Sequence, residues 1–180
     1  NVFWKESCQS RFLEISHRYA NVIEAVFSGH THMDEYRLIL ERDGEAHMPA
    51  INAPAVSPQY GNNPAFRVLT LRGEDWKPLD YRSINCNLAL SSPDYSTYYV
   101  FSEAYSLKTP LEDSLVELYP KMTTDADDRR RYVRFYYSGH DDANIIDDIN
   151  WPAYWCGIGK MGRDEYIECV NRYYSASQMN

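Results

Sequence analysis

The pattern of apolar and polar positions in the first 40 residues predicts a helix followed by two strands. Apolar side chains within residues 3–19 recur at intervals of three and four with charged residues between them, which is the period of an amphipathic helix. These apolar positions are Trp4, Cys8, Phe12, Ile15 and Tyr19. Residues 21–27 then form an apolar run of strand length that ends at the breaker pair Ser28-Gly29, and residues 34–40 resume a strand-like pattern.

The next segment predicts a loop and further strands. Asp43-Gly44 is a tight-turn signal, and residues 49–64 are rich in Pro, Ala and Asn, which predicts an ordered loop that carries a short strand. Residues 66–71 alternate between two sets of side chains, as a strand requires. The Tyr-rich and β-branched segments 79–87 and 97–105 are predicted to form a hairpin.

Helical signals begin near Lys108. Thr109-Pro110-Leu111-Glu112 reads as a capping box with Pro at the first helical position, which predicts a helix to about Leu118. A second helix is predicted from Thr124, because acidic residues fill its first turn and arginines follow, the order that the helix dipole favours. Shorter helices are predicted near residues 151–158 and 163–173. The fold class is therefore α+β, with a sheet portion at residues 1–106 and a helical C-terminal subdomain at residues 107–180.

Composition and charge narrow the possible partners. The 180 residues suffice for one domain with a core of its own, and they carry a net charge of −8. This acidic balance argues against duplex nucleic acid as a partner, which would need a basic face. A small phosphorylated substrate stays compatible, because a bound cation can supply positive charge locally. No apolar run approaches the roughly 18–20 residues of a transmembrane segment.

Gly29-His30-Thr31-His32 carries the most informative chemistry in the chain. It follows a predicted strand, so two imidazoles two residues apart on a turn can approach neighbouring points, and imidazole suits Zn, Fe or Mn. The glycine is expected to let the backbone turn tightly. The alternative is a pair of loop histidines that bind no metal. His17, His47 and His140 are isolated and are interpreted as surface or capped core residues.

Residues 26–38, Val-Phe-Ser-Gly-His-Thr-His-Met-Asp-Glu-Tyr-Arg-Leu, closely resemble the last signature of the calcineurin-like metallophosphoesterases, in the form found in acid sphingomyelinases and their relatives. Arg18-Tyr19 with Val22-Ile23 resembles the helix and strand that lead into that motif. The segments 53–58 and 63–68 resemble the next loop and strand of the family, and Trp155-Cys156 with Cys169 resembles its cysteine-bearing helical end.

This resemblance implies a specific fold and mechanism. The sheet portion would supply the last strands of a metallophosphoesterase β-sandwich, which is a four-layer αββα structure in the complete enzyme. His30 and His32 would bind different ions of a pair of divalent metals, most commonly Zn, which activate a water for attack on a phosphodiester. The resemblance also places Gln59 and Tyr60 beside the metals, as candidates for substrate binding, with ordinary loop packing as the alternative. Sphingomyelin is the leading substrate class, and nucleotide phosphodiesters follow closely.

Other parts of the family pattern are missing from these 180 residues. The sequence contains no Asp-x-His, Gly-Asp or Asn-His motif, so the bridging carboxylate and the general acid are absent and no catalytic residue is assigned here. We therefore expect a missing N-terminal half upstream and an isolated chain that is inactive alone. A non-catalytic binding module that kept the scaffold is the alternative. Asp34 is a candidate for orienting one of the two imidazoles, and a solvent-facing strand residue is the equally open alternative.

The four cysteines bear on the compartment. Cys156 and Cys169 lie 13 residues apart on two predicted helices, where a disulfide would stabilise a helical hairpin by about 3 kcal/mol. Enzymes of the resembling family act in secreted, lysosomal or periplasmic settings, where such bridges persist. A pair of buried thiols is the alternative. No motif supports a pairing for Cys8 or Cys86.

Overall fold

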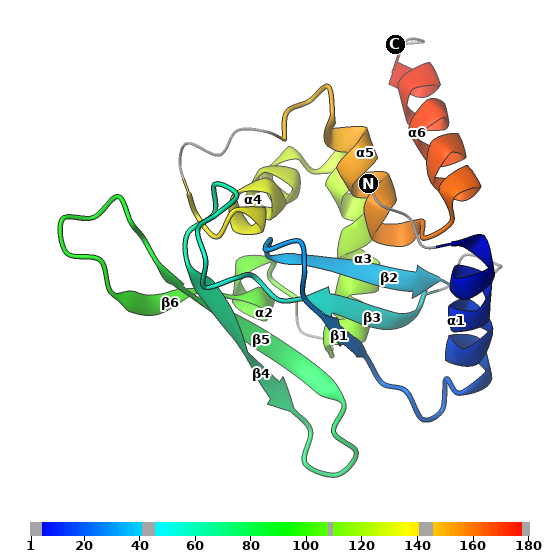
Figure 1. The fold of residues 1–180 in the computed structure, drawn as a ribbon, viewed down its shortest axis with the longest axis horizontal. Coiled ribbons are helices and arrows are strands. Elements are labelled where there is room, and N and C mark those ends of the chain that lie inside the picture. The colour runs from blue at the N-terminus through cyan, green and yellow to red at the C-terminus, as the bar shows by residue number, and fades with distance from the viewer. Residues whose placement is uncertain (1–4, 41–45, 108–109, 141–145, 178–180) are drawn as a thin grey trace.

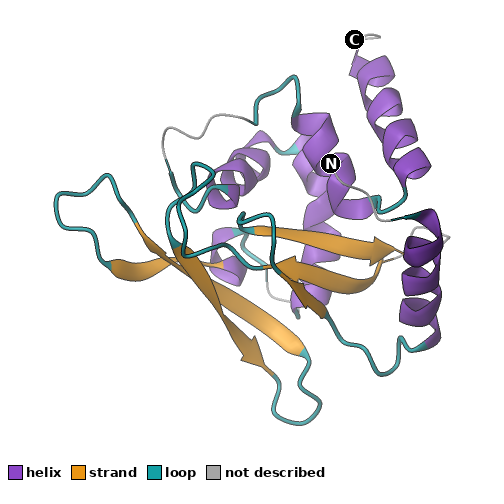
Figure 2. Cartoon of the chain, in the orientation of Figure 1, coloured by secondary structure: helices purple, strands orange, loops and turns teal. Residues whose placement is uncertain are grey.

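The computed structural model describes residues 5–40, 46–107, 110–140 and 146–177, and across these residues the chain is an α+β structure with two small sheets and six helices (Figures 1 and 2). The strands are β1 (Val26–Ser28), β2 (Glu35–Leu40), β3 (Ala46–Asn52), β4 (Ala65–Leu71), β5 (Pro78–Cys86) and β6 (Tyr95–Val100). The helices are α1 (Glu6–Arg18), α2 (Phe101–Ala104), α3 (Leu111–Thr124), α4 (Ala126–Tyr136), α5 (Trp151–Gly159) and α6 (Arg163–Ser177). The predicted fold class is confirmed at this level.

The first sheet has the strand order β1-β3-β2. Strand β1 runs parallel to β3 and β2 runs antiparallel to it, with Tyr36 opposite Ile51. The short strand predicted within residues 49–64 is the end of β3. The predicted Asp43-Gly44 turn lies outside the described residues. This sheet brings the ends of β1 and β3 and the start of β2 together, which is where the histidine motif lies.

The second sheet is antiparallel with the order β4-β5-β6. The predicted hairpin is present in β5 and β6, but the prediction that its second strand reaches residue 105 is wrong, because residues 101–104 form helix α2. The Asp80 carboxylate accepts hydrogen bonds from the Ser102 N–H at 3.2 Å and the Ser102 hydroxyl at 2.6 Å. These bonds satisfy a backbone donor outside the ladder and favour the turn of the chain into a helix, which buries Phe101.

Helix α1 forms as predicted, but its apolar positions do not form its buried face. Ile15 is 38% exposed and Tyr19 is 49% exposed, whereas Ser16 is buried. His17 is half-buried, and its Nε2 lies 3.3 Å from the carbonyl oxygen of Leu40 on strand β2. Of the two interpretations given for His17, the structure agrees with the capped core residue and not with the surface residue. Periodicity shows that a helix has an apolar face but cannot show which neighbouring element, if any, covers it.

The helix α3 continues past its predicted end at Leu118 and contains Pro120. Leu118 and Met122 are both almost fully buried on the same helix, and this burial offsets the cost of the hydrogen bond that Pro120 cannot donate. Pro110 stands at the N-cap without a side-chain cap bond, and Thr109 lies outside the described residues, so the predicted capping box does not describe this helix start. Helix α4 is capped by Asp125, whose carboxylate accepts from the N–H groups of Asp127 and Asp128.

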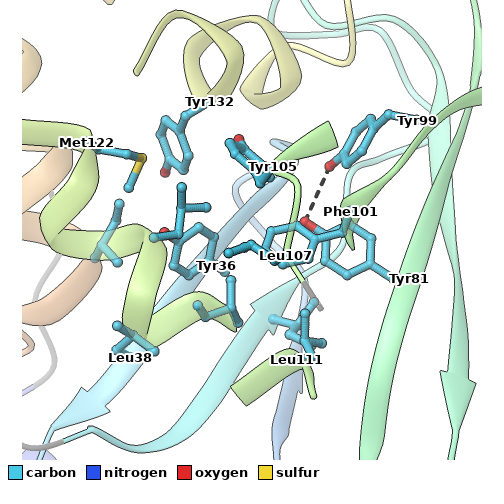
Figure 3. Packing of buried hydrophobic residues seen from close by; sticks show 14 of the residues in the cluster. Tyr36, Leu38, Tyr81, Tyr99, Phe101, Tyr105, Leu107, Leu111, Met122 and Tyr132 are labelled. Atoms are coloured by element: carbon cyan, nitrogen blue, oxygen red, sulfur yellow. Dashed lines mark hydrogen bonds between the residues drawn. The ribbon is translucent and has the colours of Figure 1, made fainter. Parts of the chain in front are cut away.

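One aromatic core joins the sheets to the helices (Figure 3). Tyr81 stacks on Phe101 at 5.0 Å between ring centroids, and Tyr36 meets Tyr132 of helix α4 edge to face at 5.9 Å. Buried leucines of α3 and Trp151 of α5 complete the cluster. The core therefore draws on residues before and after position 106, the proposed domain boundary, which stays a prediction.

Candidate metal centre

The turn between β1 and β2 holds both predicted metal ligands in an unusual backbone conformation. His30 has φ 105° and His32 has φ 68°, although neither residue is glycine. Such conformations cost on the order of 1–3 kcal/mol each and persist only where the surroundings enforce them, which is common at functional sites. The role expected for Gly29 is wrong, since Gly29 has no left-handed φ and a Cβ built on it would meet no atom within 4 Å.

Asn52, the last residue of β3, holds this turn from one side. Its Nδ2 donates to the Thr31 hydroxyl oxygen at 2.6 Å and to the Met33 carbonyl at 3.1 Å, and its Oδ1 accepts from the Ser28 hydroxyl at 3.2 Å. The Thr31 hydroxyl in turn donates to the Glu35 carboxylate at 2.7 Å. One amide side chain thus fixes residues before, within and after the pair of histidines.

The loop at residues 53–64 packs on the same turn. The Ala53 N–H donates to the Ser28 carbonyl at 2.9 Å, and the Ala55 N–H donates to the His32 carbonyl at 3.1 Å. Asn62 is fully buried and its Nδ2 lies within hydrogen-bond distance of three loop carbonyls, which ties the loop to itself. The loop is therefore positioned by the backbone of the histidine turn.

The structure brings some of the predicted site residues together. The His32 ring meets the Tyr60 ring edge to face, with 4.9 Å between centroids. Tyr60 is 52% exposed, and Gln59 and His30 are also exposed. The Nδ1 atom of His32 is buried and has no hydrogen-bond partner among the described residues. The structure thus brings His32 and Tyr60 into contact, while His30 and Gln59 are placed only as exposed residues of the neighbouring turn and loop.

Asp34 does not orient either imidazole. Its carboxylate instead points to the second sheet, where it forms an ion pair with Arg67 of β4. It also accepts hydrogen bonds from the Ser83 hydroxyl at 2.8 Å and the Tyr99 hydroxyl at 2.9 Å. Neither is it a solvent-facing strand residue, because its side chain is only 1% exposed. Asp34 therefore anchors the C-terminal end of the histidine turn to all three strands of the other sheet.

We call Asp34 and its partners Arg67, Ser83 and Tyr99, together with Tyr81, the Asp34 network. The charges in this network compensate one another. Burial alone would lower the pKa of the Arg67 guanidinium, but the Asp34 carboxylate, together with Tyr81 and Tyr99, more than offsets burial and raises this pKa, so Arg67 stays charged. The guanidinium also lies 4.2 Å from the centre of the Tyr81 ring. Burial raises the pKa of Tyr81 to about 12 and that of Tyr99 well above its usual value, so both hydroxyls stay protonated. The Tyr99 oxygen lies 3.3 Å from that of Tyr81 (Figure 3).

The residues of the turn fit a divalent metal in type but not in number. Two imidazoles are suitable zinc ligands, and the Nδ1 of His32 has no hydrogen-bond partner among the described residues. In the described part of the chain, however, no three His, Cys, Asp or Glu side chains are grouped so that they could hold an ion. The described part of the chain therefore does not provide a complete set of metal ligands.

Sequence reasoning found the histidines but missed the residues that hold them. Asn52, Asn62 and the Arg67, Ser83 and Tyr99 partners of Asp34 carry no motif of their own. The one available signal was Asp34 itself, an acidic residue directly before strand β2. Its partners lie 33, 49 and 65 residues away, beyond the reach of local patterns.

Comparison with known proteins finds relatives that are named phosphodiesterases. No protein-family model matches the chain. It is 26% identical over 174 residues to the cyclic GMP-AMP phosphodiesterase SMPDL3A of Mus musculus, covering 91% of this chain and 39% of that protein. It is 28% identical over 162 residues to sphingomyelin phosphodiesterase 2 of Caenorhabditis elegans, covering 83% and 26%.

A third relative, the human acid sphingomyelinase-like phosphodiesterase 3b, is 23% identical and covers 94% of this chain and 40% of its own length. The chain is thus a homologue of the acid sphingomyelinase-like phosphodiesterases over about nine tenths of its length, which confirms the predicted resemblance. It spans about two fifths of the length of the first of these relatives. In the described segments, no helix has the length and apolar character needed to cross a bilayer.

Proposed function

We propose that this chain is the C-terminal portion of a metal-dependent phosphodiesterase, in which its two sheets supply the last strands of a metallophosphoesterase β-sandwich. His30 and His32 would each bind one of two divalent ions, with zinc the expected metal. The observation that carries this proposal is the pair of histidines at positive φ, held in place by Asn52 and the Asp34 network. Homology to phosphodiesterases over most of the chain supports the same assignment.

Within such an enzyme the chain would contribute binding and positioning. His32, in contact with Tyr60, would hold its imidazole in one orientation, and Gln59 and Tyr60 would contact the substrate from the docked loop. Bound divalent metals supply a water of lowered pKa and stabilise charge on a phosphoryl group. The bridging carboxylate, the remaining ligands and the general acid would come from outside these 180 residues, in a part that corresponds to the remainder of the relatives.

The substrate we propose is a phosphodiester. Some relatives are named sphingomyelin phosphodiesterases and others cyclic GMP-AMP phosphodiesterases, so a sphingolipid head group and a nucleotide are both candidates. The non-catalytic binding module is favoured only by the absence of the other metal motifs from the sequence. It becomes the better assignment if no metal-dependent activity is found in the longer protein.

An oxidising compartment fits this proposal. The structure contains the predicted disulfide between Cys156 and Cys169, whereas Cys8 and Cys86 are free. Disulfides persist in secreted, lysosomal and periplasmic proteins and are rare in the cytosol of mesophiles. We therefore propose one of these three settings.

The test replaces the two histidines. In the longer enzyme, His30→Ala and His32→Ala should each lose metal and reduce the turnover of bis(p-nitrophenyl) phosphate by orders of magnitude, because a ligand is removed from a site of few ligands. The isolated chain should bind Zn²⁺ weakly and should not hydrolyse this diester. Metal content and hydrolysis rate are the measurements.

The matched control is His17→Gln. It removes an imidazole but keeps an amide donor within reach of the Leu40 carbonyl that His17 contacts, so metal content and rate should match the parent. Full metal occupancy and rate in the double variant His30→Ala/His32→Ala would refute the assignment of the turn.

A further inference from the structure

The C-terminal end of helix α4 lies where the histidine turn and the loop at residues 53–64 meet (Figure 1). The last carbonyls of a helix have no partner within the helix and must find one elsewhere. The Tyr136 carbonyl accepts from the Asp34 N–H at 3.0 Å, and the Tyr137 carbonyl accepts from the Asn63 N–H at 3.2 Å. The end of α4 therefore holds both the residue that closes the histidine turn and the end of the neighbouring loop.

The Asn63 side chain adds two further bonds at this point. Its Nδ2 donates to the Ser138 carbonyl at 3.2 Å, and its Oδ1 accepts from the Leu88 N–H at 3.2 Å. Asn63 is 1% exposed, so it reaches these partners away from competing water. One short amide thus ties the loop to helix α4 and to the segment that follows strand β5.

Asn63 lies three residues after Tyr60, the loop residue whose ring meets the His32 ring. The segment between them is a tight turn, in which Gly61 has φ 74° and the Tyr60 N–H donates to the Asn62 Oδ1 at 3.4 Å. The start of the loop is bonded to the histidine turn, and its end is bonded to α4 through Asn63. Because half of Tyr60 is exposed, the place of its ring depends on these two attachments of the backbone.

We propose that Asn63 is a positioning residue for the candidate site. By fastening the loop at residues 53–64 to the end of α4, it keeps Tyr60 against His32 and so sets the affinity for the substrate. Its part is to place the loop, and the chemistry is left to other groups. The effect on substrate affinity rests on the proposed function, whereas the effect on the ring contact needs neither metal nor hydrolysis.

The first experiment observes the ring contact in the 180-residue chain. The ring protons of His32 and Tyr60 should show a nuclear Overhauser effect in the parent, and Asn63→Ala should abolish it. Asn85→Ala is the matched control, because the Asn85 Nδ2 donates to the same Ser138 carbonyl at 2.8 Å but comes from strand β5. It removes a buried bond of the same kind without releasing the loop, so the effect should persist.

The second experiment measures kinetics in the longer enzyme. Asn63→Ala should raise KM for bis(p-nitrophenyl) phosphate about tenfold and leave kcat and metal content unchanged, because it removes binding and no chemistry. Tyr60→Leu should raise KM similarly. The double variant should be no worse than Tyr60→Leu alone, because Asn63 acts through Tyr60. Partial unfolding would instead lower kcat and leave KM unchanged.

The two experiments separate this proposal from the proposed function. A retained ring contact in Asn63→Ala, an equal loss of contact in Asn85→Ala, or additive effects of Asn63→Ala and Tyr60→Leu on KM would overturn the role of Asn63. If Asn63→Ala does not fold, Asn63→Ser carries the same expectation, because its shorter side chain cannot span both partners. An inactive longer enzyme would refute the proposed function, and the ring contact would still decide whether Asn63 positions the loop.

Discussion

At the scale of single residues, Asp34 holds the histidine turn to the second sheet. Its carboxylate is buried with three partners on the second sheet, so the charge is compensated only while all of the strands keep their places. A buried ion pair contributes little net stability by itself, but removing one partner leaves an uncompensated charge. The Asp34 network therefore holds the turn in place, because breaking it would leave a buried charge without its partner.

This predicts unequal effects within one network. Arg67→Met should lower the free energy of unfolding by about 3–5 kcal/mol, because it leaves the Asp34 carboxylate buried without its cation. Tyr99→Phe removes one hydrogen bond and keeps the ring, so it should cost about 1 kcal/mol. Urea unfolding followed by tryptophan fluorescence measures both. Similar midpoints for the two variants would show that the ion pair does not anchor the turn.

At the scale of elements, helix α5 joins the C-terminal hairpin to the core. It is bonded to α6 through the Cys156–Cys169 disulfide, and the indole N–H of Trp155 donates to the Tyr119 carbonyl of α3 at 2.8 Å. The rings of Trp155 and Tyr119 stack at 4.8 Å. This stack fixes Tyr119 against the end of α5, where only a glycine fits.

Two glycines on this helix should respond in opposite ways to alanine. A Cβ on Gly159 would lie 2.6 Å from the Tyr119 hydroxyl oxygen, so Gly159→Ala should destabilise the fold by about 1–3 kcal/mol. A Cβ on Gly157 meets open space, so Gly157→Ala should stabilise it by up to about 1 kcal/mol through helix propensity. Thermal unfolding of the two variants beside the parent tests the pair. A gain in melting temperature for Gly159→Ala would contradict the observed packing.

At the scale of the molecule, tyrosines hold the sheets and helices together. Burial raises the pKa of Tyr36, Tyr99, Tyr105 and Tyr132 well above the usual value for tyrosine. The folded state therefore binds more protons than the unfolded state above pH 10 or so. The stabilisation is complete below the unfolded pKa and is lost as the pH rises toward the folded values.

The free energy of unfolding should thus fall steadily above about pH 10. Absorbance at 295 nm should detect fewer than the 16 tyrosines titrating before the fold is lost, with the rest ionising together on unfolding. Urea midpoints at pH 8 and pH 11 provide the second measurement. Reversible titration of every tyrosine near pH 10 in a folded chain would contradict the buried core.

The sequence predicts features that depend on neighbouring residues better than features that depend on residues far apart in the chain. Strands β2, β4 and β5, helices α4 to α6 and the histidine motif carry local signals, so their positions were predicted closely. The end of β6 at Val100 and the passage of α3 through Pro120 depend on Asp80 and on core burial. The exposed side of α1 and the true partners of Asp34 depend on elements far away in sequence. The two candidate metal ligands are recognisable from a motif, whereas the residues that support them are brought together only by the tertiary structure.

The Asp34 network also has a kinetic consequence. Its hydrogen bonds close loops of 33, 49 and 65 residues, and such non-local contacts are slow to form because their closure entropy must be met first. Asn52 of β3 can hold the turn from one side, but its C-terminal end has no anchor on the second sheet until strands β4, β5 and β6 have assembled. We therefore expect the two histidines to reach their final conformation late in folding, after the secondary structure. In a refolding experiment the competence to bind Zn²⁺ should lag behind the recovery of far-ultraviolet circular dichroism.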